Sequence, residues 1–188
     1  MACKKFLLLL LLLPFLGWET SVAADVFAPN THFEVCFTPN ENCTALIVRQ
    51  IDAARHSILV QSYTFTSYPI TDALIRAKSR GVQVQVMLDK SQFKPPLNKA
   101  VMDLESAQVP LWSDNTVSIA HNKVMVFDNQ MVETGSFNYT YSAQKYNAEN
   151  VLIIESPTLA ALYSKNWYRR MAISQKIAST PHTTLKYW

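Results

Sequence analysis

The sequence predicts an α/β domain in which a mixed β-sheet is flanked by helices on both faces. Three observations lead to this prediction. Apolar residues make up 49% of the 188 residues and charged residues 16%, a balance that excludes a disordered chain. Only three glycines are present, which excludes a glycine-rich phosphate loop or a dinucleotide fingerprint. Short β-branched runs alternate with segments of helical periodicity, and this alternation is typical of a sheet covered by helices.

The first 24 residues are expected to be a secretory signal peptide rather than part of the fold. Lys4 and Lys5 precede an apolar run of 13 residues, which Pro14 interrupts, and small residues follow up to Ala24. A membrane-spanning helix needs roughly 20 apolar residues. We therefore expect cleavage after Ala24, a domain over residues 25–188, no stable membrane insertion after cleavage, and a periplasmic or secreted location. An uncleaved membrane anchor is the alternative.

Two cysteines, Cys36 and Cys43, remain after the predicted cleavage, with a turn-rich hexapeptide between them. An even number of cysteines in an oxidising compartment favours a disulfide. Two free buried thiols are the alternative. A zinc site is less favoured, because no CxxC or HxxxH spacing completes it.

The first half of the domain reads as two helices between three strands. The β-branched and aromatic run 57–65 predicts a buried strand, and valines alternate along 82–88. Pro69 suits the first turn of a helix, and Gly81 stands where a helix C-cap belongs. In order, the predicted elements are strand 31–37, helix 44–55, strand 57–65, helix 69–80 and strand 82–88.

The second half is predicted to contain a helix, five short strands and a long amphipathic helix. Asp128 and Asn129 suit a two-residue hairpin turn. Phe127 would then pair with Gln130, which sets Lys123 opposite residue 134. In order, the predicted elements are helix 95–108, strands 109–112, 117–120, 124–127, 131–134 and 150–155, and helix 157–176.

A cluster of polar side chains is expected on this hairpin. His121 and Lys123 are two residues apart, so on a strand they point to the same face. The predicted pairing sets Ser136 opposite His121, and Asn138 lies two residues further on. An imidazole, an ammonium group and two neutral hydrogen-bonding groups in one place suit a tetrahedral anion.

The spacing HxKx4D followed by GSxN resembles the signature of the phospholipase D superfamily. The pattern is matched at His121, Lys123, Asp128, Gly135, Ser136 and Asn138. Residues 57–89 and 147–150 are also similar to segments of this family. The single motif copy, the chain length and the signal peptide are most similar to small bacterial Nuc-type endonucleases. Most lipid-cleaving relatives carry two copies in a longer chain.

The resemblance implies a phospholipase D-like α/β/α sandwich with one motif per chain and a role for each motif residue. His121 is expected to be the nucleophile that forms a phosphohistidine, and Lys123 and Asn138 to hold the non-bridging oxygens, assisted by Ser136. Glu149 is expected to orient His121. Asp128 is expected to be structural, because a turn position lies away from His121. Lysines and amides carry the charge in this scheme, so no metal or cofactor is expected.

A second histidine must act as general acid, and no other histidine of the chain lies in a second motif. We therefore expect a homodimer whose two copies of His121 share one active site.

The substrate is expected to be nucleic acid, with DNA favoured and RNA possible. The formal charge of +3 permits an anionic partner without requiring one. Lys90, Lys94 and Lys99 follow the predicted strand 82–88 and could bind a phosphate backbone, although an ordinary solvated loop is the alternative. A lipid phosphodiesterase and a non-catalytic nucleic-acid-binding protein are the two competing functions.

Overall fold

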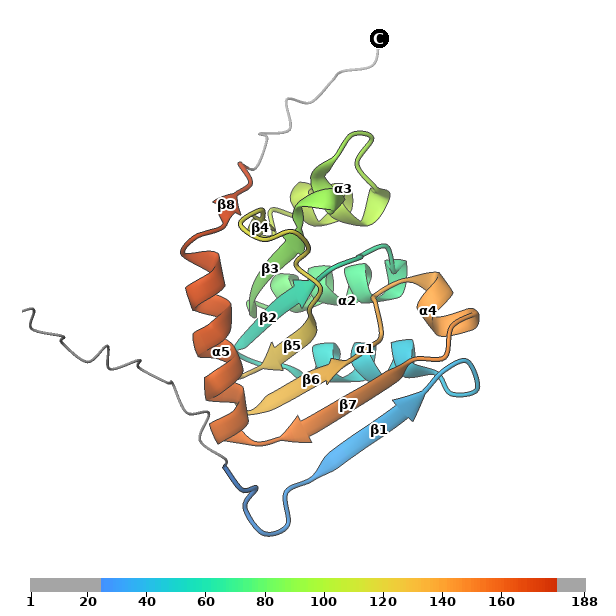
Figure 1. The fold of residues 1–188 in the computed structure, drawn as a ribbon, viewed down its shortest axis with the longest axis vertical. Helices are drawn as coiled ribbons and strands as arrows, with labels where there is room; N and C mark the ends of the chain where they lie inside the picture. The colour runs from blue at the N-terminus through green and yellow to red at the C-terminus, as the bar shows by residue number, and fades with distance from the viewer. Residues whose placement is uncertain (1–24, 179–188) are drawn as a thin grey trace, which may run out of the picture.

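The computed structural model describes residues 25–178, so the predicted signal peptide and residues 179–188 lie outside the described part. Eight strands form one mixed sheet in the order β1-β7-β6-β5-β2-β3-β4-β8 (Figure 1). The pairs β2–β3 and β3–β4 are parallel, and all other neighbours are antiparallel. Within residues 25–178, no helix has the length and apolar character needed to cross a bilayer.

The strands and helices alternate along the chain much as predicted. The strands are β1 (Phe33–Phe37), β2 (Ser57–Ser62), β3 (Gln83–Asp89), β4 (Leu111–Asp114), β5 (Lys123–Phe127), β6 (Met131–Gly135), β7 (Asn150–Glu155) and β8 (Gln175–Lys176). The helices are α1 (Cys43–Ala53), α2 (Tyr68–Ser79), α3 (Lys99–Ser106), α4 (Tyr141–Lys145) and α5 (Pro157–Met171), with a 3-10 turn at Lys90–Phe93.

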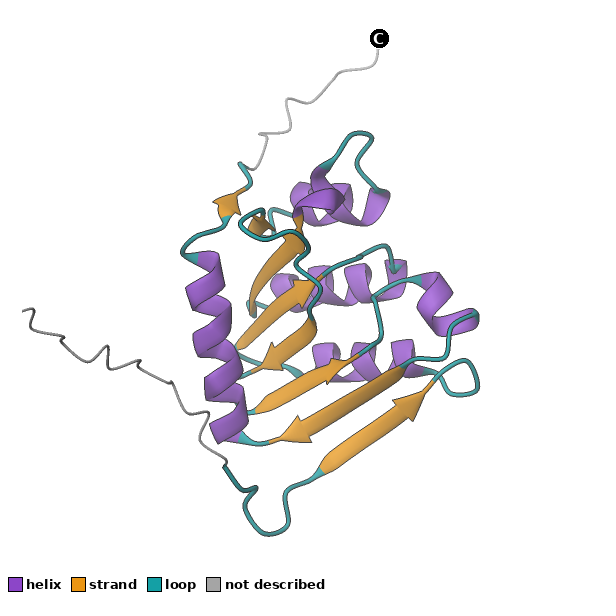
Figure 2. Ribbon diagram, in the orientation of Figure 1, coloured by secondary structure: helices purple, strands orange, loops and turns teal. Residues whose placement is uncertain are grey.

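Helices cover both faces of the sheet, which confirms the predicted fold class (Figure 2). One face packs against α1 and α2 through a large apolar cluster that includes Ile47, Ile58 and Met125. The other face packs against α5, where Trp167 is buried against Trp112 and its indole nitrogen donates to the carbonyl oxygen of Val60 at 2.9 Å. Because β2 and β5 are buried on both faces, residues 58–60 and 124–127 are apolar without alternation.

The topology gathers the ends of several strands at one edge of the sheet, which we call the site edge. The carboxyl end of β2 meets the start of β5, where Ser62 pairs with Lys123. The carboxyl end of β1 meets the start of β7, where Phe37 pairs with Asn150. The parallel strand β3 also ends at this edge, at Asp89. Segments that are distant in the sequence therefore meet there.

Several predicted elements differ from the structure: the strand predicted over 57–65 ends at Ser62, and the short helix α4 was not predicted. Residues 117–120 form no strand, and Asp89 binds this segment instead through the backbone nitrogen of Ala120. The helix predicted from residue 95 begins at Lys99, after two prolines, with Asn98 as its N-cap. The last helix ends at Met171, and the chain then adds β8 to the edge of the sheet.

The hairpin between β5 and β6 has the predicted turn but a different register. Asp128 and Asn129 both have positive φ, 53° and 54°, as a primed turn requires. Phe127 pairs with Met131 rather than Gln130, so the predicted pairing is one residue out. The observed register sets Val126 opposite Val132, and both valines pack beneath α5. A one-residue slip would turn the apolar side chains of β6 to the wrong face.

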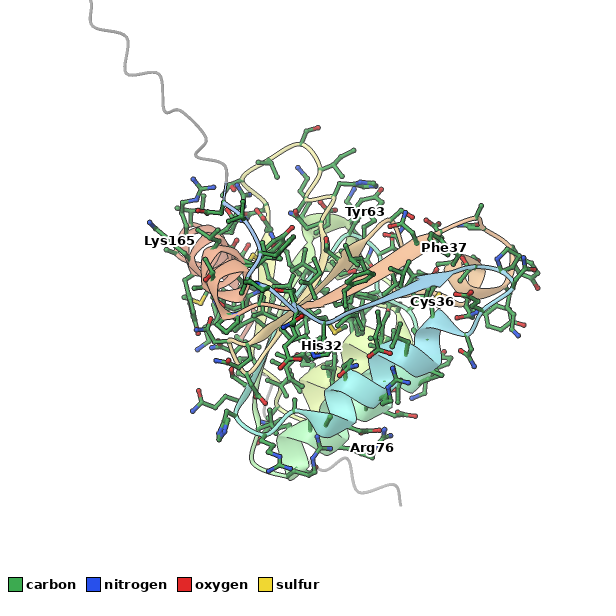
Figure 3. The ribbon with its side chains drawn as sticks, turned by 90° about the horizontal axis from the view of Figure 1, so that it is seen from below. His32, Cys36, Phe37, Tyr63, Arg76 and Lys165 are labelled. Atoms are coloured by element: carbon green, nitrogen blue, oxygen red, sulfur yellow. A yellow bond between two sulfur atoms is a disulfide. The ribbon has the colours of Figure 1, made fainter. Side chains whose placement is uncertain are left out.

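Cys36 and Cys43 form a disulfide, as predicted, with their Cα atoms 5.5 Å apart. The bond joins the end of β1 to the first residue of α1. Figure 3 shows Cys36 and Phe37 on opposite sides of β1. The disulfide therefore ties the edge strand to the helical layer close to the site edge.

Candidate active site

The motif residues surround the site edge. Lys123 is the first residue of β5, and His121 lies just before this strand rather than within it. Ser136 follows the last residue of β6, and Glu149 precedes β7. Since β5, β6 and β7 are neighbours in the sheet, these side chains come from adjacent strand ends.

His121, Lys123 and Tyr63 form one packed unit. The ring of His121 lies against that of Tyr63, with the centroids 4.8 Å apart. The Lys123 Nζ donates to the carbonyl oxygen of His121 at 2.9 Å and lies 5.3 Å from the centre of the Tyr63 ring. The backbone nitrogen of Tyr63 donates to the carbonyl oxygen of Asn122 at 2.9 Å. Sequence reasoning placed Tyr63 within the predicted strand 57–65 and gave it no role, whereas it directly follows β2 in the structure.

Lys123 is a largely desolvated cation, with 5% of the residue exposed. Burial holds the pKa of its ammonium group below the ordinary value, while the negative charge of Glu149 acts in the opposite direction. A cation in this position attracts an anion more strongly than one in bulk water. Lys123 is therefore suited to bind a phosphate oxygen.

Glu149 accepts hydrogen bonds on both carboxylate oxygens. Ser136 Oγ donates to Oε2 at 2.5 Å, and Asn147 Nδ2 donates to Oε1 at 2.9 Å. Its backbone is held by Thr38, whose nitrogen donates to the Glu149 carbonyl oxygen and whose hydroxyl accepts from the Glu149 nitrogen, both at 3.1 Å. Among residues 25–178, the hydrogen bonds of the Glu149 carboxylate thus come from Ser136 and Asn147, and none comes from His121.

The glycine of the motif is needed for close approach of two strands. A Cβ atom on Gly135 would lie 2.1 Å from the carbonyl oxygen of Asn150. That oxygen accepts from the Ser136 nitrogen at 3.1 Å, and the Ser136 hydroxyl accepts from the Asn150 nitrogen at 3.1 Å. The absence of a side chain at Gly135 therefore lets β7 hold Ser136 in position.

Asn138 carries a buried oxygen that has no hydrogen-bond partner within residues 25–178. Buried amide groups are normally paired. The side chain is half-buried and lies two residues after Ser136 in the motif. It therefore has hydrogen-bonding capacity that the described part of the chain does not use.

Asp89 holds the segment that leads to His121. Its carboxylate accepts from the backbone nitrogens of Ala120 at 2.7 Å and Ser91 at 2.8 Å. Burial alone would raise the pKa of Asp89, but these hydrogen bonds and the charge of Lys90 outweigh it and keep the pKa below the usual value. Sequence reasoning did not single out Asp89, because a carboxylate at the end of a strand has no distinctive pattern.

Asp128 lies at the opposite end of β5 from His121. Its carboxylate accepts from the backbone nitrogens of Arg55, His56 and Ser57 at 2.7–3.0 Å. These bonds outweigh the effect of burial and keep the pKa of Asp128 below the usual value. In the structure, Asp128 ties the hairpin turn to the start of β2.

The three lysines predicted to bind substrate lie in different surroundings. Lys90 donates to the carbonyl oxygen of Val117 at 2.9 Å. Lys99 forms an ion pair with Asp103 at 2.6 Å on α3. Lys94 is exposed in the turn between them. Two of the three ammonium groups are thus already bound within the chain.

The cluster as a whole can bind a phosphate diester and supply one imidazole. Across residues 25–178, no three His, Cys, Asp or Glu side chains gather into a group that could hold a metal ion. The groups present are an imidazole, a desolvated ammonium group, an amide and a hydrogen-bonded carboxylate.

Comparison with known proteins agrees with this arrangement. Residues 47–171 match the family described as "Cardiolipin synthase, PLD-like domain". The chain is 44% identical over 147 residues to a phospholipase D of Rickettsia prowazekii, covering 78% of this chain and 71% of the relative. It is 28% identical over 151 residues to the mitochondrial cardiolipin hydrolase of Xenopus laevis, covering 75% and 71% of the two chains.

Solved structures show the same fold. The crystal structure of Nuc, a phospholipase D family member from Salmonella typhimurium, superposes with a TM-score of 0.74 at 32% identity and covers 79% of this chain and 99% of Nuc. NucT from Helicobacter pylori shares the fold with a TM-score of 0.70 at 21% identity, over 78% of this chain and 99% of NucT.

Proposed function

Since this chain belongs to the phospholipase D superfamily, as a phosphodiesterase of its hydrolase type, we propose that it is a secreted or periplasmic endonuclease. It cleaves DNA without sequence preference and without a metal ion. The observation that carries the proposal is the packed unit of His121 and Lys123 at the site edge, next to the hydrogen-bonded pair of Ser136 and Glu149. The single motif copy in the sequence, which is the pattern of the small endonucleases that it resembles, favours nucleic acid as the substrate.

The proposed reaction proceeds in two displacements at phosphorus. The imidazole of His121 attacks the phosphorus atom, and the bond to the leaving oxygen breaks as a second imidazole gives that oxygen a proton. The second imidazole then takes a proton from water, whose oxygen attacks the phosphohistidine and releases His121. Lys123 and the amide of Asn138 hold the non-bridging oxygens throughout. The Tyr63 ring keeps the imidazole in its orientation.

The second imidazole comes from the partner subunit in a homodimer. Within residues 25–178, the other two histidines precede β1 and β2, at the strand ends remote from the site edge. His182 lies outside the described residues. A two-fold axis through the site edge supplies a second copy of His121 in a symmetric arrangement. Glu149 then has a second imidazole within the same dimer to orient.

An apolar surface beside the site supports the dimer. Phe33, Val35 and Phe37 alternate along β1, which sets them on one face, and each is between 42% and 67% exposed. Helix α5 packs on β6, β5, β2 and β4, so it covers the neighbouring part of the same sheet face. Contiguous exposed apolar side chains mark an association surface, and β1 leads directly to Thr38, which holds Glu149.

A lipid phosphodiesterase is the second candidate. The names of the relatives favour it, because those from Rickettsia are called phospholipase D and that from Xenopus cardiolipin hydrolase. This candidate requires headgroup release from phospholipid vesicles to exceed DNA cleavage.

The test is a cleavage assay on the purified chain with plasmid DNA, RNA and phospholipid vesicles, each in excess EDTA. We expect DNA cleavage that survives the chelator and is abolished by His121→Asn. Lys165→Ala, on the exposed side of α5, serves as the matched control and should retain activity. Loss of cleavage in EDTA, or full activity of His121→Asn, would overturn the proposal. Salt-sensitive DNA binding without turnover would instead identify a binding protein.

A further inference from the structure

A cavity lies between segments that also lead to the active site. The cavity, of about 530 Å³, opens between the amino-terminal ends of α1, α2 and α4. This volume is in the range of pockets that hold small organic groups, about 300–1,000 Å³. Its walls combine apolar side chains, such as Val48 and Pro69, with polar ones, such as Thr44 and Gln144. None of the roles assigned above uses this cavity.

The cavity and the active site share the same two chain segments. The carbonyl oxygen of Tyr139 accepts from the backbone nitrogens of Thr66 at 2.8 Å and Ser67 at 2.9 Å. Tyr139 directly follows Asn138 of the motif, and Thr66 lies three residues after Tyr63. Thr66, Ser67 and Thr140 line the cavity. A substrate that extends from the site edge along these segments therefore reaches the cavity next.

Polar side chains share the wall of this cavity with the apolar ones, and one of them is Ser67. Ser67 is 5% exposed and occupies the N-cap position of α2, yet its side chain forms no capping hydrogen bond. Serine at this position usually binds a backbone nitrogen of the first turn. Here, the hydroxyl is left for a group that enters the cavity. A pocket that combines apolar side chains with hydrogen-bonding groups suits a flat heterocycle with polar edges.

Exposed aromatic rings and lysines form the rim. Tyr68 and Tyr141 both line the cavity and are 53% and 63% exposed. Lys145 lines it as well, and Lys99 Nζ lies 5.9 Å from the centre of the Tyr68 ring. Aromatic faces beside cations bind single-stranded nucleic acid, because unpaired bases stack on the rings while the cations follow the backbone.

Building on the nuclease function proposed above, we propose that this cavity receives an unpaired base next to the scissile phosphate, so that the substrate is single-stranded nucleic acid. Tyr68 and Tyr141 stack on the base, and the Ser67 hydroxyl bonds its polar edge. Bases in a duplex are stacked and paired, so they enter such a pocket only after unstacking. The Lys145 ammonium group and the polar side chains of the wall favour a base over an acyl chain, which offers them no hydrogen bonds.

The test compares three substrates with the full chain in EDTA. They are a labelled single-stranded DNA oligonucleotide, the same strand in a duplex, and a small chromogenic phosphate diester. We expect the single strand to be cleaved at least about tenfold faster than the duplex. The diester reports the catalytic chemistry alone. If the diester and both DNA forms remain intact, the nuclease function itself fails. If both DNA forms are cleaved equally, only the present inference fails.

Variants then locate the base. Tyr141→Ala and Tyr68→Ala should each raise the KM for the single strand, by a factor about tenfold larger than any change in the KM for the diester. Tyr141→Phe should restore the wild-type KM for the single strand. Tyr168→Ala, an exposed tyrosine on α5, is the matched control. A single abasic nucleotide placed beside the cleaved bond should reproduce the Tyr141→Ala effect. Unchanged KM in the tyrosine variants would overturn the proposal. Vesicle hydrolysis that depends on these tyrosines would overturn it in favour of an acyl chain.

Discussion

At the scale of single residues, Glu133 is the most unusual side chain in the fold. It is fully buried in β6, and the Tyr139 hydroxyl donates to its Oε2 at 2.5 Å. Its Oε1 has no partner within residues 25–178. Burial raises the pKa of Glu133 to about 8 and raises the pKa of Tyr139 well above its usual value. This neutral pair joins the two ends of the segment that carries Ser136 and Asn138.

We predict that Glu133 makes the protein less stable as the pH rises. Its pKa is about 8 in the folded chain against an ordinary value of 4.5, so the folded state binds the extra proton between these values. The contribution is complete below about pH 4.5 and is lost as the pH approaches 8, at up to about 1.4 kcal/mol per pH unit. Glu133→Gln keeps an acceptor for Tyr139 and should flatten this slope.

Urea unfolding at pH 5, 6, 7 and 8 measures the effect. Glu155→Gln, at an exposed position at the end of β7, is the matched control and should leave the slope unchanged. An equally steep slope in Glu133→Gln would show that another group titrates.

At the scale of elements, the meeting of β6 and β7 determines the position of the motif serine. Gly135 pairs with Val151 in a register that leaves no space for a side chain beside Asn150. The β5–β6 hairpin is held at its other end by Asp128, which binds three backbone nitrogens before β2. The strand pair is therefore constrained at both ends, so Ser136 and Lys123 keep a constant separation.

We predict that Gly135→Ala damages both stability and activity. The added Cβ must displace the backbone of β7, which should lower the free energy of unfolding by roughly 1–3 kcal/mol. Because the shift moves Ser136 and Asn150, phosphodiester hydrolysis should fall at least about tenfold. Gly81→Ala is the contrasting variant, since φ there is +92° but the space is open. It should lower stability by about 1 kcal/mol and leave activity intact. A fully active Gly135→Ala would contradict the close packing.

At the scale of the whole molecule, the fold places the imidazole of His121, the proposed nucleophile, at the site edge, and no other histidine of residues 25–178 lies there. The apolar face of β1 runs to the same edge, and the disulfide between Cys36 and Cys43 anchors this strand to α1. These features suit an enzyme whose active site is completed by a second copy.

We predict that His121→Asn subunits inhibit wild-type subunits in mixed dimers. If each site needs two copies of His121, an equal mixture in which subunits have exchanged should retain about half the activity of the wild-type protein added, because mixed dimers are inactive. Independent monomers would retain all of it. Wild-type and His121→Asn subunits are refolded together, and DNA cleavage is measured. In the control, affinity-tagged wild-type subunits replace the His121→Asn subunits. Undiminished activity, despite recovery of tagged mixed dimers, would exclude a shared site.

The residues of the candidate site could be predicted where the intervals of the sequence motif identify them. His121, Lys123, Ser136 and Asn138 stand at intervals that can be read directly from the chain, and the buried strands around them are apolar enough to recognise. Tyr63 and Asp89 could not be found in this way. Each acts through a contact across more than thirty residues, and such contacts leave no local pattern.

The sequence by itself determined the fold class, the alternation of strands and helices and the disulfide, because periodicity, turn residues and cysteine number act over short distances. Only the tertiary structure decided the hairpin register and the partner of Glu149. It also decided that Lys90 and Lys99 are bound within the chain, and that a cavity opens between segments that lead to the motif. These features arise where strand ends and helix ends meet, and their positions depend on how the whole core packs.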